Sequence, residues 1–324
     1  MKFYLHIGTN KTGTSSIQRS LSDSTELLAE NGICYPDTGR DDEYRVAHHP
    51  FAELGRNFPR QMAEQVASMV EEAESRGLDS IILSSEAFHT VHAHIVGQAL
   101  KGHDVEVFAF LRPHAEYYSS WYREAVKSKN AKAPLDAFIS NVYQPYFYWL
   151  DRWSNVFGLS HVHPIEYDRS KLLLHSSTYQ LLHEIGLSEN VIKKFPQHTY
   201  ENPSISGNLL YTKRLINRHI SLTTAHSLIP EVLLLSELDF TFRGPLHIPQ
   251  GTAEKIYNLY ESDCLRLQDS YGIDLLREPH EVPGHKSPDP ETLPHHKNVL
   301  LSFAKENDFE VAKIIEKFNV FEQH

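Results

Sequence analysis

The sequence has little cysteine, no long apolar run and no excess of positive charge. Its only cysteines among 324 residues are Cys34 and Cys264, too few and too far apart for a disulfide framework or a four-ligand zinc site. No segment approaches the roughly 18 consecutive apolar residues that a membrane-spanning helix needs, and the N-terminus lacks the apolar stretch of a signal peptide. These absences predict a cytoplasmic protein whose fold is stabilised by the packing of its core, without disulfides or a structural zinc ion.

The charge balance is acidic. Lysine and arginine total 31 against 42 acidic residues, for a formal net charge of −11. Nucleic acid is therefore not expected as a partner, because binding it requires a basic face. Histidine is abundant at 21 residues, but its pairs show no spacing that would bring ligands together on a metal. We expect no metal cofactor.

What is present is an ordinary globular composition, 40% hydrophobic and 23% charged, with short apolar runs between longer amphipathic segments. The runs are too short for helices and predict strands at residues 2–7, 80–84, 105–111 and 162–167. Apolar periodicity predicts helices over 14–32, 62–76, 172–187 and 256–276. Strands that alternate with helices predict an α/β fold with a three-layer parallel sheet flanked by helices.

The C-terminal part of the chain has a different composition. From about residue 170 onward the pattern is mainly helical, and residues 279–296 are rich in proline, histidine and acidic residues, as in a linker. One amphipathic helix is expected over 297–318. We therefore predict a main domain at 1–278, with helical C-terminal additions, and a linker and helix at 279–324.

The most informative segment is FYLHIGTNKTGTSSIQ, which begins at Phe3. Here a predicted strand enters a turn that contains Gly8 and Gly13 and continues directly into a predicted helix near Thr14. A helix N-terminus offers unpaired N–H groups and the positive end of the helix dipole, and glycines let the backbone approach an anion closely. The segment predicts a phosphate-binding loop.

The loop differs from the nucleotide-triphosphate P-loop, in which a lysine directly follows the second glycine. In this chain Thr14 follows Gly13, and the lysine is Lys11, on the other side of that glycine. The difference weakens the alternative of a small-molecule kinase or NTPase without removing it. A non-catalytic module that binds nucleotide is a further alternative, although such a module would need neither a leaving-group cation nor a base.

The five residues Lys11-Thr12-Gly13-Thr14-Ser15 match the form K-[ST]-G-T-[ST]. In this respect the sequence resembles the sulfotransferases that use 3′-phosphoadenosine 5′-phosphosulfate (PAPS), whose 5′-phosphosulfate loop has this form. The resemblance implies a P-loop-NTPase-like sulfotransferase fold and PAPS as co-substrate. It extends over about residues 1–278 and is specific only in the cofactor motifs.

A second motif supports the resemblance. The strand VEVFAFL is followed by Arg112, and Ser120 stands eight residues later, as in the arginine and serine that hold the 3′-phosphate in this family. A guanidinium at a strand end can make forked, charge-assisted hydrogen bonds to phosphate. Ser119 could take the serine role instead, but the spacing favours Ser120.

The predicted catalytic base is Glu86, two residues after the end of the strand at 80–84. The carboxyl ends of parallel strands open onto one crevice, which would place Glu86 near Lys11 and Arg112. In carbohydrate-modifying members of the family a glutamate after the second strand removes the proton from the acceptor hydroxyl. Members acting on small molecules use a histidine, so the neighbouring histidines remain alternatives: His89, His92 and His94.

The resemblance thus implies sulfuryl transfer from PAPS to an acceptor hydroxyl on a carbohydrate or glycoconjugate. Lys11 and Glu86 would be the catalytic residues. Lys11 would offset charge that develops on the departing 5′-phosphate, while Glu86 would accept a proton from the acceptor. The same resemblance assigns the cofactor to the loop and to the second motif: Lys11, Thr12, Gly13, Thr14, Ser15, Arg112 and Ser120.

Overall fold

The computed structural model describes residues 1–40, 46–198 and 204–321. The chain forms two compact units. The sheet unit comprises Met1–Pro113, Pro145–Tyr200 and Ser262–Leu275, and the helical unit comprises His114–Gln144, Glu201–Glu261 and Leu276–His324.

A five-stranded parallel sheet with the order β2-β3-β1-β4-β5 forms the centre of the sheet unit. The strands are β1 (Lys2–His6), β2 (Ile33–Cys34), β3 (Ser80–Ser84), β4 (Asp104–Leu111) and β5 (Val162–Glu166). The four predicted strands are thereby confirmed. The fifth, β2, has two residues, too few to give a periodic signal in the sequence.

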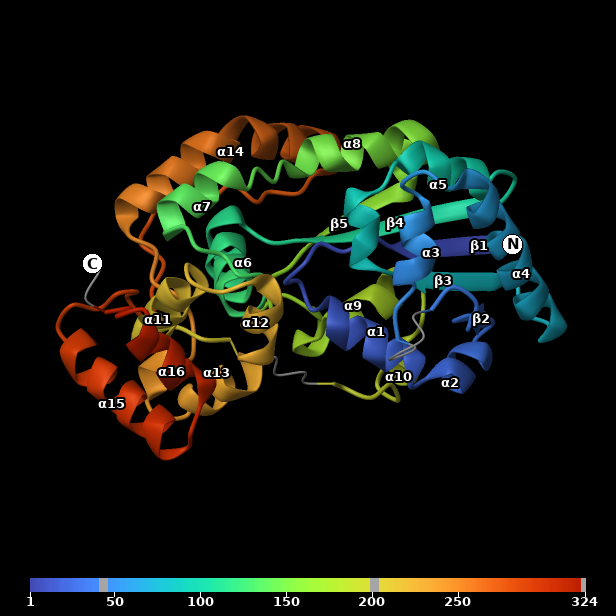
Figure 1. Cartoon of the computed structure of the whole chain (residues 1–324). Coiled ribbons are helices and arrows are strands. Elements are labelled where there is room, and N and C mark those ends of the chain that lie inside the picture. The colour runs from blue at the N-terminus through green and yellow to red at the C-terminus, as the bar shows by residue number, and fades with distance from the viewer. Residues whose placement is uncertain (41–45, 199–203, 322–324) are drawn as a thin grey trace. The chain divides into compact units, whose positions relative to one another are not determined.

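Helices cover both faces of the sheet, which confirms the predicted α/β class. Figure 1 shows α5 (Ala93–Ala99) and α8 (Tyr146–Phe157) on one side, and α1 (Thr14–Ser22) and α9 (Ser177–Glu184) on the other. The remaining elements of the unit are short helices and turns and one long helix: α2 (Thr25–Ala29), α3 (His49–Leu54), α4 (Pro59–Ser75), η1 (Glu86–Thr90), η2 (Leu159–His161), η3 (Leu173–His175) and α10 (Glu189–Ile192).

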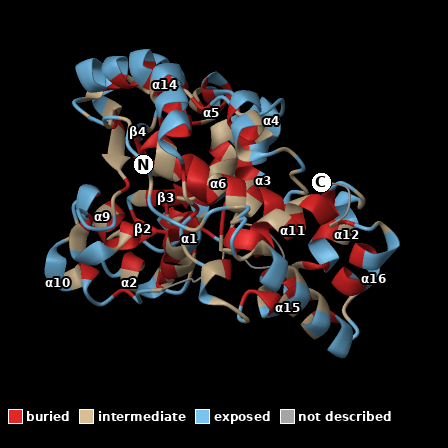
Figure 2. Ribbon diagram, turned by 90° about the vertical axis from the view of Figure 1, so that its left-hand side faces the viewer, coloured by how far each residue is buried: buried red, intermediate tan, exposed pale blue. Residues whose placement is uncertain are grey.

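Alternation along the strands explains the two-sided core. In β4, Phe108 and Phe110 face the core that contains Ile17 of α1 and Tyr179 of α9. Successive strand residues point to opposite faces, so their neighbours in sequence face the other layer. Helix α4 has the complementary pattern, with buried residues along one side (Figure 2), namely Met62, Val66, Met69 and Ala73.

Two of the predicted helices in the sheet unit are shorter than expected. The helix expected over 14–32 is divided into α1 and α2, with Asp23 and Ser24 between them. The helix expected over 172–187 begins only at Ser177, because Leu174 has a φ of 48°. A left-handed residue cannot continue an α-helix, and apolar periodicity does not reveal backbone handedness.

The helical unit contains no β-strand among its described residues. Its elements are α6 (His114–Ser128), α7 (Leu135–Asn141), α11 (Gly207–Asn217), α12 (Leu222–Ser227), α13 (Ile229–Leu235), η4 (Phe240–Phe242), α15 (Leu293–Glu306) and α16 (Glu310–Lys317). Helix α14 (Gln250–Tyr271) belongs to both units. In the described parts of the chain, none of the helices combines the length and apolarity required to cross a bilayer.

The C-terminal region differs from its expected form in two places. Within the expected linker, Val282 and His285 form β-bridges with Ile248 and Leu246, so this segment is attached to the helical unit. The prediction of a single helix over 297–318 is wrong. The segment forms two helices, α15 and α16, which are separated at Asp308, a residue with a φ of 53°. The boundary at 278/279 remains a prediction about domain organisation.

Candidate active site

The predicted phosphate loop follows the central strand of the sheet. β1 lies between β3 and β4, and the connections that leave β1 and β3 lead to opposite sides of it, so the loop lies at the topological switch point. In open parallel sheets, ligands bind at this point, outside the carboxyl ends of the strands. The architecture therefore places the loop where a ligand is expected.

The loop backbone requires its glycines. Gly8 and Gly13 have φ values of 85° and 82°, and Lys11 also lies in the left-handed region with φ 67°. Two threonines fix the turn: Thr12 Oγ1 donates to the Thr9 carbonyl oxygen at 2.6 Å, and Thr9 Oγ1 donates to the Phe110 carbonyl oxygen at 3.1 Å. The Thr12 hydroxyl is thus engaged in shaping the loop. The group of Thr12 that could donate to a bound phosphate is therefore its backbone N–H.

Helix α1 begins directly after the loop. Gly13 is its N-cap residue and has no side chain to occupy the orphan N–H groups of the first turn. Thr14 is buried and Ser15 is exposed, while Ser16 Oγ donates to the carbonyl oxygen of His198 at 2.6 Å. The positive end of the helix dipole therefore opens toward the loop.

The N-terminus of α9 also borders the loop, which the sequence did not reveal. A Cβ added to Gly13 would overlap the hydroxyl of Ser177 and would lie 3.4 Å from the ring of Tyr167. The neighbouring Thr178 is 1% exposed, and its hydroxyl has no hydrogen-bond partner among the described residues. Two helix N-termini thus converge on Gly13.

Glu86 lies against the other glycine of the loop. A Cβ on Gly8 would come within 3.0 Å of the Glu86 Cα and 3.1 Å of its Cβ. The backbone on the two sides is joined by a hydrogen bond from the Ser85 N–H to the His6 carbonyl oxygen, 3.0 Å long. Ser85 also caps the turn η1 by accepting from the Ala87 N–H. The geometry thus brings the predicted base beside the predicted phosphate loop.

Two side chains that the sequence did not single out flank the Glu86 carboxylate. Gln18 of α1 donates from Nε2 to Glu86 Oε2 at 2.6 Å, and His49 Nε2 lies 3.8 Å from the same oxygen. The other ring nitrogen of His49 is 2.7 Å from Ser85 Oγ. His49 lies 37 positions before Glu86 in the sequence, and only the tertiary fold brings the two together. Sequence spacing could therefore not predict this contact.

The three histidines considered as alternative bases are arranged differently. His89 packs on Trp149, with ring centroids 4.6 Å apart, and His92 packs on His94 at 5.5 Å. His49, which was not among these three, lies 3.8 Å from the Glu86 carboxylate. Assignment of the base to Glu86 remains a prediction.

Arg112 reaches the loop from the end of β4. Its Nη1 donates to the Lys11 carbonyl oxygen at 3.4 Å, and its guanidinium lies 5.6 Å from the centroid of the Tyr167 ring. The Tyr146 hydroxyl donates to the Arg112 carbonyl oxygen at 2.9 Å. The structure therefore joins the two predicted cofactor motifs, because Arg112 and Lys11 are in direct contact.

Ser120 belongs to α6 in the helical unit. Its pairing with Arg112 stays a prediction, because the two units are not placed relative to each other. Within the helical unit the neighbouring Ser119 hydroxyl donates to the Leu246 carbonyl oxygen at 3.2 Å. Ser120 has no such hydrogen bond to the described residues.

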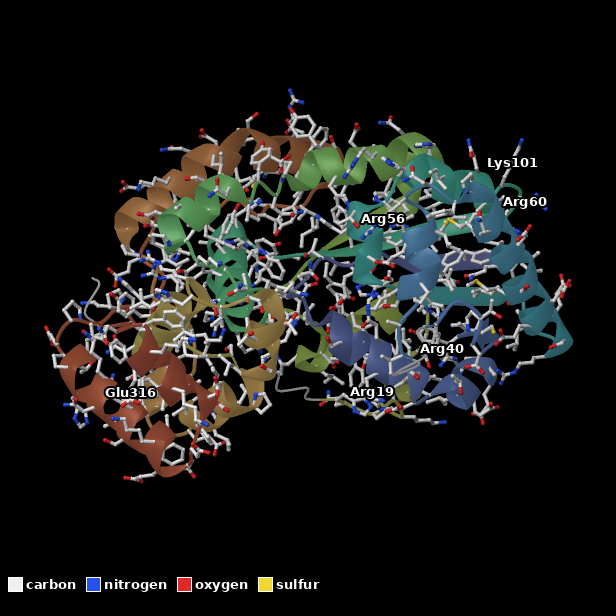
Figure 3. All side chains as sticks on the ribbon, viewed as in Figure 1. Arg19, Arg40, Arg56, Arg60, Lys101 and Glu316 are labelled. Atoms are coloured by element: carbon white, nitrogen blue, oxygen red, sulfur yellow. The ribbon has the colours of Figure 1, made fainter. Side chains whose placement is uncertain are left out.

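A buried, neutral histidine ends the strand that leads into the loop. His6, the last residue of β1, is fully buried, and its Nδ1 is 2.7 Å from Ser84 Oγ. Burial lowers the pKa of His6 to about 3, because the interior disfavours the charged form. His6 therefore adds no positive charge beside the loop, whereas Lys11 and Arg112 do. The arginines labelled in Figure 3 lie on other elements, for example Arg19 on α1 and Arg60 on α4.

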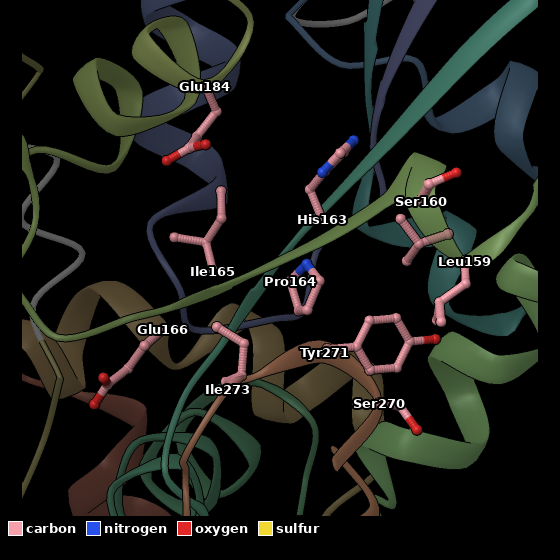
Figure 4. A pocket seen from close by; sticks show the side chains of 11 residues that line it. Leu159, Ser160, His163, Pro164, Ile165, Glu166, Glu184, Ser270, Tyr271 and Ile273 are labelled. Atoms are coloured by element: carbon pink, nitrogen blue, oxygen red, sulfur yellow. The ribbon is translucent and has the colours of Figure 1, made fainter. Parts of the chain in front are cut away.

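A pocket of about 780 Å³ lies elsewhere in the sheet unit, at the edge strand β5. Its lining includes His163, Glu166 and Glu184, together with Tyr271 at the end of α14 (Figure 4). None of the predicted site residues lines it. The phosphate loop and this pocket are therefore separate features of the sheet unit.

Comparison with known proteins gives little further information. No family model matches the chain, and no curated protein matches it significantly. Among solved structures, the chain is similar to a sulfotransferase from Alicyclobacillus acidocaldarius, with a TM-score of 0.46 and 13% sequence identity over 84% of this chain and 96% of the other. A likeness this weak carries no argument about function, which must rest on the residues themselves.

Proposed function

We propose that this protein is a sulfotransferase that uses PAPS. Lys11 and Thr12 to Ser15 would hold the 5′-phosphosulfate, and Arg112 with Ser120 would hold the 3′-phosphate. PAPS would supply the sulfuryl group for transfer to an acceptor hydroxyl. The proposal rests on the contact between motifs 101 residues apart, in which Arg112 donates to the Lys11 carbonyl oxygen.

The loop geometry fits a phosphate group. Gly8, Lys11 and Gly13 have left-handed backbone conformations, which turn the chain into helix α1. The first N–H groups of α1 are the donors that anion sites at helix N-termini use. Lys11 adds a point charge at this position. It would offset the negative charge that develops on the oxygen joining the 5′-phosphate to sulfur.

Glu86 would remove the proton from the acceptor hydroxyl. A general base must lie within reach of the reacting group, and Glu86 touches the loop through Gly8. Gln18 donates to one carboxylate oxygen and His49 lies 3.8 Å from the same oxygen, which leaves the other oxygen of Glu86 to accept the proton. We assign Gln18 and His49 as positioning residues. Lys11 and the helix N-terminus supply the charge compensation in this scheme, so it requires no metal ion.

The acceptor in this proposal is a hydroxyl of a carbohydrate or glycoconjugate. This part follows from the resemblance of Glu86 to the glutamate of carbohydrate-modifying sulfotransferases, and a cytoplasmic location is likewise a prediction from the sequence. A kinase remains the alternative to be tested, although Thr14 stands where a P-loop has its lysine.

Calorimetric titration with 3′-phosphoadenosine 5′-phosphate, ATP and ADP tests the cofactor. The wild type should prefer the 3′,5′-bisphosphate, and Arg112→Ala should weaken its binding by roughly 10- to 100-fold, as expected for lost hydrogen bonds to a charged group. Arg60→Ala is the matched control, because Arg60 pairs with Glu64 on the surface. Equal or tighter binding of ATP by the wild type would overturn the proposal in favour of a kinase.

A further inference from the structure

Polar side chains gather at the amino end of the sheet, opposite to the phosphate loop. Strand pairing places Lys2 of β1 beside Asp104 of β4. Continuing the register of β4 and β5 places Glu106 beside His161, one residue before the Val107–Val162 pair. Alternation puts these side chains, and His163 two residues further along, on one face of the sheet.

The distances within this cluster are short. Asp104, Glu106 and His161 each offer one ligand atom, and these atoms lie within 4.8 Å of one another. Glu106 Oε1 is 3.3 Å from His161 Nδ1, and Glu106 Oε2 is 2.6 Å from His163 Nε2. Two ligands on one tetrahedral zinc ion are separated by about 3.3 Å when each bond is about 2.0 Å. The Glu106–His161 pair already has this separation.

We propose that Asp104, Glu106 and His161 bind a zinc ion at this end of the sheet. Imidazole nitrogen and carboxylate oxygen are ordinary zinc ligands, and three protein ligands leave a fourth position for water. His163 would be a positioning residue, since it holds the second oxygen of Glu106 and thereby orients the first toward the metal. Partners of this kind fix the ligands of metal sites.

Lys2 is the natural competitor of the ion. Its Nζ lies 3.7 Å from Asp104 Oδ2 and 3.8 Å from Glu106 Oε1. The ammonium group thus offsets the two carboxylates when no metal is bound, and zinc must displace it. Loss of this charge should therefore tighten zinc binding, whereas in a purely structural ion-pair network it would only remove a favourable contact.

Bound zinc would attach the edge strand to the rest of the sheet. Among the residues that the structure describes, β5 pairs with β4 alone, and the pocket beside it is lined partly by His163 (Figure 4). A zinc ion bound by both Glu106 of β4 and His161, the last residue of η2 directly before β5, would link the two strands. An ion that binds only the folded state also stabilises it. This inference does not depend on the proposed sulfuryl transfer.

Cobalt(II) titration tests the site, because cobalt replaces zinc and gives visible absorption bands when its coordination is tetrahedral. The wild type should bind one ion per chain with such bands, and zinc should displace it. Glu106→Gln should abolish the bands, and Asp104→Asn, at an exposed position, should weaken binding with little effect on folding. Lys2→Gln should tighten binding by about tenfold or more, on the scale seen for residues that surround metal ligands.

Asp23→Asn provides the matched control. Asp23 Oδ2 is 2.9 Å from His198 Nε2, so this variant disrupts another carboxylate–imidazole pair of the same unit. It should bind cobalt as the wild type does. Absence of tetrahedral bands in the wild type would overturn the inference, and so would bands that Glu106→Gln and Lys2→Gln leave unchanged, because the ion would then lie among other histidines of the chain.

Discussion

The two ends of the sheet present opposite chemistry to ligands. At the carboxyl end, glycines expose backbone N–H groups beside Lys11 and Arg112, an arrangement suited to anions. At the amino end, Asp104 and Glu106 meet His161, an arrangement suited to a cation. The helix after a strand starts at the carboxyl end and returns to the amino end, so helix dipoles favour the same division.

The difference between the ends also lies in which part of the chain supplies the ligands. The phosphate loop uses backbone that is held open by Gly8 and Gly13, with few side chains. The amino end uses side chains that extend from neighbouring strands, and its backbone is already paired within the sheet. Substitutions of the metal ligands at the amino end should therefore act through side-chain chemistry, whereas substitutions of the loop glycines should act through backbone conformation.

The largest effect is expected from Glu86→Gln. The amide retains a hydrogen bond with Gln18 but cannot accept the proton of the acceptor, so turnover should fall by about 10²- to 10⁴-fold. Binding of 3′-phosphoadenosine 5′-phosphate should remain, since Glu86 contacts the loop through Gly8 and holds no phosphate. Release of this product with a panel of sugar and phenolic acceptors measures turnover.

Glu26→Gln is the control for this prediction. Glu26 is an exposed glutamate of the same unit that pairs with Arg76 on the surface, and its substitution should leave turnover as in the wild type. Full activity in Glu86→Gln would remove Glu86 as the base and direct attention to His49. A parallel loss of turnover and of nucleotide binding would instead indicate a disturbed loop.

A smaller effect concerns pH and the buried His6. Burial lowers its pKa to about 3 in the folded state, whereas an unfolded histidine titrates near 6.5. Above pH 6.5 both states are neutral and stability is complete. Below it the unfolded state takes up a proton that the native state refuses down to about pH 3, so stability falls across this interval. At pH 5 the loss from this residue should be about 2 kcal/mol.

His6→Asn should reduce this acid sensitivity. Asparagine can still reach the Ser84 hydroxyl, which His6 contacts at 2.7 Å, but it does not titrate. Urea unfolding at pH 7 and pH 5 measures the effect as the difference between the two free energies. The variant should be less stable than the wild type at pH 7 but should lose less on acidification. Burial also lowers the pKa of His114, to about 4. This histidine should therefore contribute to the acid sensitivity that remains in the His6→Asn variant.

The sequence predicted features that lie within one segment and missed those that only the fold assembles. Gly8, Lys11 and Gly13 are contiguous with the strand and helix that position them, so the loop was visible in the sequence. The meeting of Lys11 with Arg112 followed from the rule that parallel strands end at one edge. Neither spacing nor periodicity could connect His49 with Glu86, or Ser177 with Gly13, because these contacts depend on how separate helices pack.

The amino-end cluster was missed for a related reason. His161 and Glu106 are 55 residues apart, and only the register of β4 against β5 brings them together. The spacing of neighbouring histidines is readable from the sequence without a fold. Register depends on the whole sheet, so His–carboxylate sites that span adjacent strands cannot be recognised from such spacing.

The smallest expected effect is the difference in stability between two glycine-to-alanine variants, Gly13→Ala and Gly77→Ala. This difference separates the cost of a left-handed backbone from the cost of crowding at the phosphate loop. Gly13 and Gly77 both have positive φ, 82° and 70°, but a Cβ on Gly77 would meet nothing within 4 Å. Gly77→Ala therefore costs only the left-handed conformation, about 1 kcal/mol. Gly13→Ala adds an overlap with Ser177 and should cost about 1 kcal/mol more, in the lower range for an overpacked site.

Urea unfolding of both alanine variants measures this difference, and Ser177→Ala in the Gly13→Ala background tests its cause. Removing the Ser177 hydroxyl should recover most of the additional cost, while the strain common to both glycines should remain. Equal destabilisation of the two single variants would show that α9 does not confine the loop. Gly13→Ala should also weaken binding of 3′-phosphoadenosine 5′-phosphate, whereas Gly77→Ala should not, because Gly77 lies outside the loop that presents its N–H groups to the anion.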